Sequence, residues 1–419
     1  MLRVEGRIAN DDREFVGAIE IDTETGLIAW VGRVEGRSDL DTESCIIFPG
    51  FGDLHVHARE DFSGRETYKE DFASASAAAI HGGVTHFADM PNNPVAPIDD
   101  ASYAAKEQLT AGSEVHITLY GGIGPGTRPL ERRVPYKAFM GPSVGELFFS
   151  SAEQLEETIA RYRGCNVSFH CEDPLVLDQS REARTHEARR PAKAEISATR
   201  FALQLIERYE LIGKLCHFST GEGMRDVIAA KARGVRVTCE VTPHHLFFDD
   251  TMLTDDNRLW LQMNPPLRGR DDRLAMIEAL HSGAIDYLAT DHAPHTADEK
   301  QGGISGVPHL DTYGAFATWL MVEQRFSSRD IARVCASNPG KFVAEFLPKS
   351  FGRGFGRVEA GYAGSVTILD LRTPYTVTRE SLQTKCGWSP FEGVTFPGSV
   401  RYTVINGRVH TQTRGGGER

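Results

Sequence analysis

Short β-forming apolar runs alternate with helix-like stretches through the middle of the chain. The eight runs cover residues 50–54, 84–88, 115–119, 136–139, 166–169, 214–218, 235–240 and 285–289. Helix-like stretches lie between most of them, at 67–80, 152–162, 197–209, 223–232 and 271–280. Eight strands separated by helices are typical of a (β/α)8 TIM-type barrel, so the predicted fold class is α/β. Residues 121–135 are rich in Gly and Pro, which predicts an irregular third crossover.

Both ends of the chain are β-rich. Apolar runs with turn signals between them cover residues 2–8, 15–22 and 27–31, and runs of the same kind follow at 364–369 and 400–409. A chain of 419 residues suits one large barrel plus a small extra module. We therefore predict that residues 1–49 and 351–419 together form a small β-sandwich module, and that residues 50–350 form the catalytic barrel.

Charge and composition exclude several classes of protein. The net charge is −12, and no basic face suited to nucleic acid is evident. No apolar run approaches the ~20 residues of a membrane span, and the charged N-terminus lacks a signal-peptide core. Seven cysteines without a C-x-x-C pair argue against a disulfide framework. We expect a cytoplasmic protein that binds neither nucleic acid nor membranes.

Metal-binding side chains follow four of the predicted strands. His55 and His57 alternate after the first strand, so both imidazoles can meet one ion. His170, His217 and Asp291 follow the fifth, sixth and eighth strands. Active sites of such barrels lie at the carboxyl ends of the strands. The pattern therefore predicts a metal centre there, although an isolated His-x-His pair can also occur by chance.

The fourth strand contains Lys137, a lysine in an apolar segment. One interpretation is that its amine extends to solvent. The other is that carbon dioxide carboxylates the amine, giving a carbamate whose two oxygens can bridge two cations. Imidazole and carboxylate ligands favour two divalent ions, Zn²⁺ first, with manganese or cobalt as substitutes. A hydroxide bridging the two ions would be the nucleophile, with Asp291 both a metal ligand and the group that shuttles its proton.

This set of residues resembles the amidohydrolase superfamily and, within it, the dihydroorotases. The resemblance runs from FPGFGDLHVHARE to KCGWSPFEG and TVINGRV, over most of the chain. It implies that His55 and His57 bind the more buried metal and that His170 and His217 bind the second. It also implies that carboxylated Lys137 bridges the two, and that Asp291 is a metal ligand and the catalytic base and acid.

The resemblance also implies substrate contacts. Arg59 and His295 match residues that bind the substrate carboxylate in dihydroorotases, and Asn92 and Asn264 match two further polar contacts. Each has a simpler interpretation, since Arg59 could form a surface ion pair and Asn next to Pro is an ordinary turn signal. The segment 302–316 departs from the family's pattern, which leaves the substrate contacts of this loop open.

The implied reaction is the reversible closure of N-carbamoyl-L-aspartate to L-dihydroorotate in de novo pyrimidine biosynthesis. Two alternatives remain at this point. The chain could be a related cyclic amidohydrolase, an allantoinase or hydantoinase, or an inactive dihydroorotase-like scaffold for aspartate transcarbamoylase. All the expected metal ligands are present, which disfavours the scaffold. Dimers are common among such proteins, so a homodimer is one assembly to expect.

Overall fold

A closed barrel of parallel strands forms the centre of the computed structural model, which describes residues 1–34, 36–142 and 147–412. Its strands are β5 (Phe51–Val56), β6 (Val84–Asp89), β7 (His116–Leu119), β8 (Gly121–Ile123), β9 (Tyr136–Phe139), β10 (Asn166–His170), β11 (Ile212–Leu215), β12 (Val237–Val241) and β13 (Tyr287–Leu288). β5 to β7 pair in one parallel sheet and β8 to β13 in a second. Only Tyr120 separates β7 from β8, so the two act as one bent strand. A parallel bridge between Val56 and His292 joins the last strand to the first.

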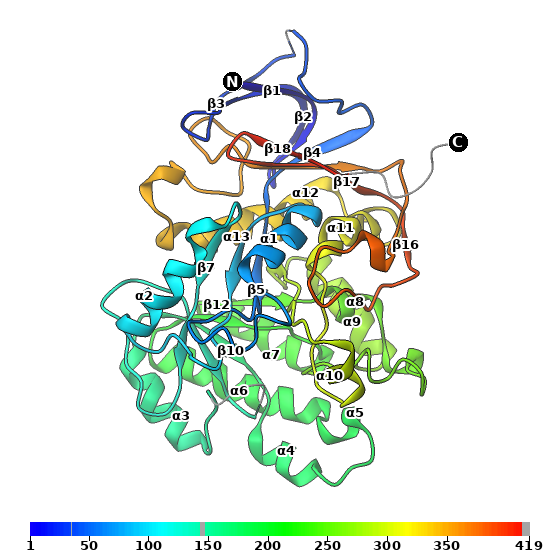
Figure 1. Cartoon of the computed structure of the whole chain (residues 1–419). Coiled ribbons are helices and arrows are strands. Elements are labelled where there is room, and N and C mark those ends of the chain that lie inside the picture. The colour runs from blue at the N-terminus through cyan, green and yellow to red at the C-terminus, as the bar shows by residue number, and fades with distance from the viewer. Residues whose placement is uncertain (35, 143–146, 413–419) are drawn as a thin grey trace.

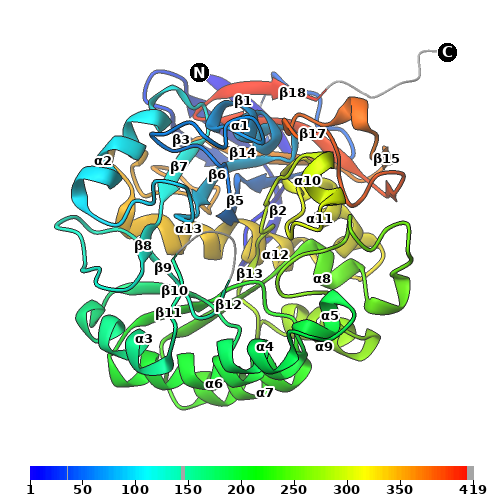
Figure 2. The same ribbon diagram turned by 60° about the horizontal axis from the view of Figure 1, so that its bottom comes forward.

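Helices surround these strands (Figure 2). The longer ones are α1 (Phe72–His81), α2 (Asp100–Leu109), α3 (Ala152–Ile159), α6 (Ala192–Arg208), α7 (Gly221–Ala232), α9 (Arg270–His281) and α11 (Tyr313–Val322). Shorter ones are α4 (Pro174–Ser180), α5 (His186–Arg189), α8 (Pro243–Phe247), α10 (Ala297–Gln301), α12 (Ser328–Ala332) and α13 (Asn338–Val343). No helix lies between β8 and β9, as the Gly- and Pro-rich sequence there predicts.

The barrel strands are buried on both faces, as parallel strands covered by helices must be. Side chains between the strands and the helices form one large apolar core. Local signals fix where the helices begin: the Asp71 carboxylate accepts the backbone N–H of Ser74, and the Ser74 side chain reaches back to the cap. The predicted α/β barrel architecture is confirmed.

A seven-stranded sheet combines the two ends of the chain and lies above the barrel in Figure 1. Its strands are β1 (Leu2–Ala9), β2 (Glu14–Asp22), β3 (Leu27–Gly32), β4 (Cys45–Pro49), β14 (Val366–Asp370), β17 (Ser399–Ile405) and β18 (Arg408–Thr411), in the order β18-β17-β14-β4-β1-β2-β3. It has a small apolar core of its own. Only Gly50 separates β4 from β5, so this sheet leads directly into the barrel. Residues 413–419 of the expected C-terminal part lie outside the described residues.

The C-terminal segment also returns to the mouth of the barrel. After the short ribbon β15 (Tyr375–Thr376) it passes Trp388, whose indole N–H donates to the carbonyl oxygen of His295 at 2.7 Å, and then enters β16 (Thr395–Phe396). The Thr384 hydroxyl contacts the Glu70 carboxylate. Residues far apart in the sequence therefore build one side of the barrel mouth. In the described part of the chain, no helix has the length and apolar character needed to span a bilayer.

Candidate metal centre

The carboxyl ends of the barrel strands surround a small polar cavity. It is lined by His55, His57, Arg59, Asn92, Phe139, His170, His217, Asn264, Asp291, Ala293, Ser305 and Gly306. Eight of the ten residues expected at the site are among these. The other two, Lys137 and His295, are not among the lining residues and are buried.

Three ligand groups come from the first and last strands of the barrel. The Asp291 Oδ1 atom lies 3.1 Å from His55 Nε2 and 3.0 Å from His57 Nε2. Buried Asp53 holds the two strands in register, because its carboxylate accepts the backbone N–H groups of His55 and Thr290, both at 3.1 Å. The three ligand groups are close enough to share one metal ion.

The second pair of imidazoles comes from the fifth and sixth strands. His170 Nδ1 and His217 Nε2 lie 2.8 Å apart, and the ring centroids of His55 and His217 are separated by 5.3 Å. His217 and Asp291 both have positive φ, at 36° and 50°. Non-glycine residues rarely adopt this backbone conformation, and such strain concentrates at functional sites.

Buried acceptors orient the imidazole rings. Glu240 contacts Nδ1 of His55, Asn92 Oδ1 lies 2.8 Å from Nδ1 of His57, and Glu172 Oε2 lies 2.9 Å from Nε2 of His170. The opposite ring nitrogen of each histidine is thereby directed toward the other ligand groups. Among the described residues, buried His55 Nε2 makes no hydrogen bond, although Asp291 Oδ1 lies 3.1 Å from it. Rings held in this way are the usual arrangement of histidine metal ligands.

Two buried lysines at the site differ in their partners. Lys214 forms an ion pair with Glu240 and also donates to the Leu54 carbonyl at 3.3 Å. Lys137 is equally buried, and its Nζ lies 2.9 Å from Cys216 Sγ. In the described part of the chain no carboxylate lies within ion-pair distance of Lys137. A buried amine without a counter-charge is the kind of group that carboxylation would turn into an anion.

Burial determines the charge states of the ligands. It lowers the pKa of His55, His57, His170 and His217, and nearby Lys137 lowers each further. Metals bind neutral imidazole, so these shifts favour the ligand form. Burial raises the pKa of Asp291 to about 7, against the opposing effect of Lys137. This donor set fits divalent ions of the zinc type.

The opposite wall of the cavity carries hydrogen-bonding groups for a substrate. Arg59 is 2% exposed and has a φ of 64°. Its Nε donates to the Pro294 carbonyl at 3.3 Å, and its Nη2 lies 3.1 Å from His295 Nε2. Within the described residues, Arg59 has no carboxylate in ion-pair distance and buried Asn264 Oδ1 has no hydrogen-bond partner.

Sequence reasoning missed three charged residues that support the ligands. Glu240, Lys214 and Glu172 are fully buried. Burial opposes the charged form of Glu172, but Arg190 and His170 overcome this effect and lower its pKa. Glu240 and Lys214 each interrupt an apolar strand, which is the signal that singled out Lys137.

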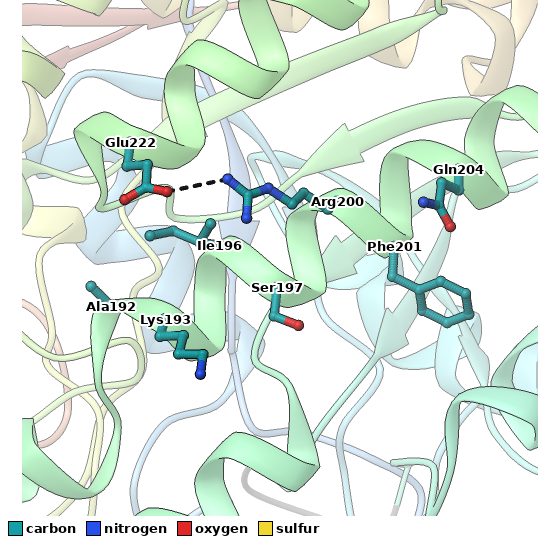
Figure 3. Close-up of a pocket in the computed structure, with 8 residues that line it drawn as sticks. All are labelled: Ala192, Lys193, Ile196, Ser197, Arg200, Phe201, Gln204 and Glu222. Atoms are coloured by element: carbon teal, nitrogen blue, oxygen red, sulfur yellow. Dashed lines mark hydrogen bonds and ion pairs between the residues drawn. The ribbon is translucent and has the colours of Figure 1, made fainter.

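A further hollow lies on the outer side of α6 (Figure 3). Its lining includes Arg200, whose guanidinium pairs with Glu222 at 3.2 Å and with Asp226 at 2.7 Å. It is lined by none of the residues of the metal centre, so the chemistry is expected in the barrel mouth.

An eight-stranded barrel with histidines and an aspartate at its strand ends is typical of metal-dependent hydrolases. The model of the amidohydrolase family matches residues 46–410, and the chain belongs to this family. It is 34% identical to the dihydroorotase of Thermococcus kodakarensis over 415 residues, covering 97% of this chain and 94% of that protein. It is 32% identical to the dihydroorotase of Pyrococcus furiosus over 412 residues, covering 97% of this chain and 91% of that protein.

Solved structures share the fold. The L-hydantoinase (dihydropyrimidinase) of Arthrobacter aurescens has a TM-score of 0.87 at 22% identity, covering 98% of this chain and 96% of that one. The D-hydantoinase (dihydropyrimidinase) of a Thermus species has a TM-score of 0.82 at 21% identity, covering 98% of this chain and 95% of that one. At these identities the likeness is one of fold. Family and relatives together make the chain a hydrolase of cyclic amides.

Proposed function

We propose that the chain is a dihydroorotase, which interconverts N-carbamoyl-L-aspartate and L-dihydroorotate in de novo pyrimidine biosynthesis. Curated relatives of this name match nearly the whole chain. The structural observation that carries the proposal is the buried Arg59 guanidinium beside the ligand groups. It faces the cavity without a carboxylate partner among the described residues.

A buried cation needs a counter-charge, and a substrate can supply it. L-Dihydroorotate carries a carboxylate on its ring, whereas hydantoin and dihydrouracil carry none. A guanidinium presents five N–H donors in a planar fork that suits a carboxylate. Neighbouring His295 adds a further group on the same side of the cavity. Arg59 therefore favours the carboxylate-bearing ring over its uncharged relatives.

The proposed metal ligands are the residues expected from the sequence. His55 and His57 would hold one divalent ion and His170 and His217 the second, with carboxylated Lys137 between them and Asp291 as a further ligand. Zn²⁺ is the ion that this donor set fits best. When bound, the two ions would polarise the scissile carbonyl and activate the attacking water.

The protein's own groups then orient the substrate and move protons. In the hydrolytic direction, water oxygen bonds to the ring carbonyl carbon and the ring C–N bond breaks. Asp291 takes the proton from water and delivers it to the leaving nitrogen. Arg59, Asn92, Asn264 and His295 would hold the ring in place.

A substrate panel with the purified, zinc-loaded protein tests the proposal. Ring opening of L-dihydroorotate is measured beside that of hydantoin, dihydrouracil and allantoin, together with metal content. We expect bound metal and a clear preference for L-dihydroorotate. Opening of hydantoin or allantoin without L-dihydroorotate would make the chain a different cyclic amidohydrolase. Absence of both metal and turnover would favour a non-catalytic scaffold.

A further inference from the structure

A buried lysine amine lies behind the substrate-facing wall of the cavity. Lys300, in α10, is fully buried. Its Nζ donates to the backbone carbonyl oxygens of Gln262, Ile304 and Gly306, each at 2.9 Å. An ammonium group has three N–H donors, so these three carbonyls satisfy it completely.

The three carbonyls belong to two segments that line the cavity. Gln262 lies two residues before Asn264, and Ile304 and Gly306 flank Ser305. Asn264, Ser305 and Gly306 all face the cavity. The segments also touch directly, because the Gly306 N–H donates to the Gln262 carbonyl at 2.9 Å. One amine therefore holds together two loops that would contact the substrate.

The same amine is also linked to His295, which is buried beside Arg59. Its Nζ lies 5.7 Å from the ring centroid of Trp388, and the Trp388 indole donates to the carbonyl of His295. Gly306 packs against the same residue, since a Cβ there would lie 2.9 Å from His295 Cδ2 and 2.7 Å from the Ala293 carbonyl. Movement of the 304–306 segment would therefore disturb His295 and, through it, Arg59.

Burying this amine is costly. Burial lowers the pKa of Lys300 to about 7. Within the described residues no carboxylate lies in ion-pair distance of it, so its hydrogen bonds go to backbone alone. A surface lysine would avoid this cost, and an apolar residue could fill the space. What an apolar residue could not do is hold three backbone carbonyls of two loops at one point.

We propose that Lys300 is a positioning residue that fixes the loops 262–264 and 302–306, and with them the groups that orient the substrate ring. The inference rests on the proposed function only for the identity of that ring. Lys300 touches neither the metal ligands nor Asp291, so its effect falls on substrate binding.

The test compares Lys300→Met with Lys231→Met. Lys231 is the control, because its Nζ also donates to a backbone carbonyl, that of Ala284 at 2.7 Å, but lies away from the cavity and pairs with Asp286 at 2.5 Å. We expect Lys300→Met to raise the KM for L-dihydroorotate by roughly tenfold or more, as losing one or two hydrogen-bonded contacts implies. The kcat should change by less than about threefold and metal content should be unchanged. Lys231→Met should lower thermal stability and leave KM unchanged.

A second readout needs no substrate. Hydrogen–deuterium exchange of peptides covering 302–307 should be faster in Lys300→Met than in the wild type and in Lys231→Met. If the wild type does not turn over L-dihydroorotate, the proposed function fails, while the exchange experiment still decides the role of Lys300. Unchanged exchange in these peptides, or an unchanged KM in an active enzyme, would overturn the positioning role.

A variant outside Lys300 covers the case in which Lys300→Met does not fold. The Gln262 side-chain amide donates to the Gly303 carbonyl and, at 3.4 Å, to Ser305 Oγ. Gln262→Met loosens the same loop and keeps the buried amine. We expect faster exchange at 302–307 and a smaller rise in KM, and the absence of both changes would refute the inference.

Discussion

Replacing Arg59 by methionine tests the substrate assignment most directly. Methionine keeps much of the apolar volume and removes the guanidinium. Two nitrogens of the Arg59 guanidinium already have partners, the Pro294 carbonyl and His295 Nε2. Among the described residues its other N–H donors have no such partner, so they can bind a substrate carboxylate. Removing one partner of a buried ion pair costs about 3–5 kcal/mol. At 1.36 kcal/mol per factor of ten, kcat/KM for L-dihydroorotate should fall by about 10²–10⁴.

The specific prediction is a coupling between the guanidinium and the substrate carboxylate. The assay measures kcat/KM of wild type and Arg59→Met with L-dihydroorotate and with dihydrouracil, the same ring without the carboxylate. The kcat/KM for dihydrouracil should change little in Arg59→Met. The preference of the wild type for L-dihydroorotate over dihydrouracil should therefore be largely lost in the variant. These four values form a double-mutant cycle in which one of the two changes is in the substrate.

Arg273→Met is the matched control. Arg273 is also largely buried, and its Nε donates to Asp249 at 3.1 Å, but it does not line the cavity. This variant should be less stable yet keep the preference between the two rings. A fall of kcat/KM that is equal for both rings in Arg59→Met would refute the carboxylate-binding role and indicate a structural one.

Three further predictions concern the metal centre and the buried amines. Glu240→Gln should weaken metal binding by about 10–100-fold, measured by competition with a chelator, because the carboxylate that orients His55 is lost. Lys137→Ala should lose metal and activity, with partial rescue by small carboxylates, and full activity without rescue would rule out the bridging role. Burial lowers the pKa of Lys300 from 10.5 to about 7, so the folded state binds fewer protons than the unfolded state between these values. The melting temperature of the wild type should therefore rise relative to that of Lys300→Met as the pH increases from 7 toward 10. A difference in melting temperature that does not change with pH would contradict this.

The barrel could be predicted because its strands carry a local signal. Strands buried on both faces read as short apolar runs, and β9 begins and ends at the predicted residues, 136 and 139. The bend at Tyr120, which divides one barrel strand into β7 and β8, carries no such signal, because it depends on pairing with β6 on one side and β9 on the other.

The clustering of the candidate metal ligands was predictable for a related reason. A closed barrel brings all strand ends to one rim, so His170 and Asp291 could be placed together without knowledge of their distance in space. The residues that orient these side chains could not be predicted from the sequence. Glu240 stands 185 positions from His55 in the sequence, and only closure of the barrel makes them neighbours. A charged residue in an apolar strand indicates that its side chain is buried, but the sequence does not show which residue pairs with it.

Lys300 shows where sequence reasoning fails for a physical reason. The segment Ala297–Gln301 is a short charged helix, which in isolation indicates a solvated surface. Its lysine is nonetheless fully buried, because Trp388 from the C-terminal segment and the loop at Gln262 cover it. Both covering segments come from distant parts of the chain, and the amine's partners are backbone carbonyls, which leave no trace in residue identity. The wall that would select the substrate is therefore built from long-range contacts that no local sequence pattern reveals. The candidate metal centre is built from side chains that local sequence patterns do reveal.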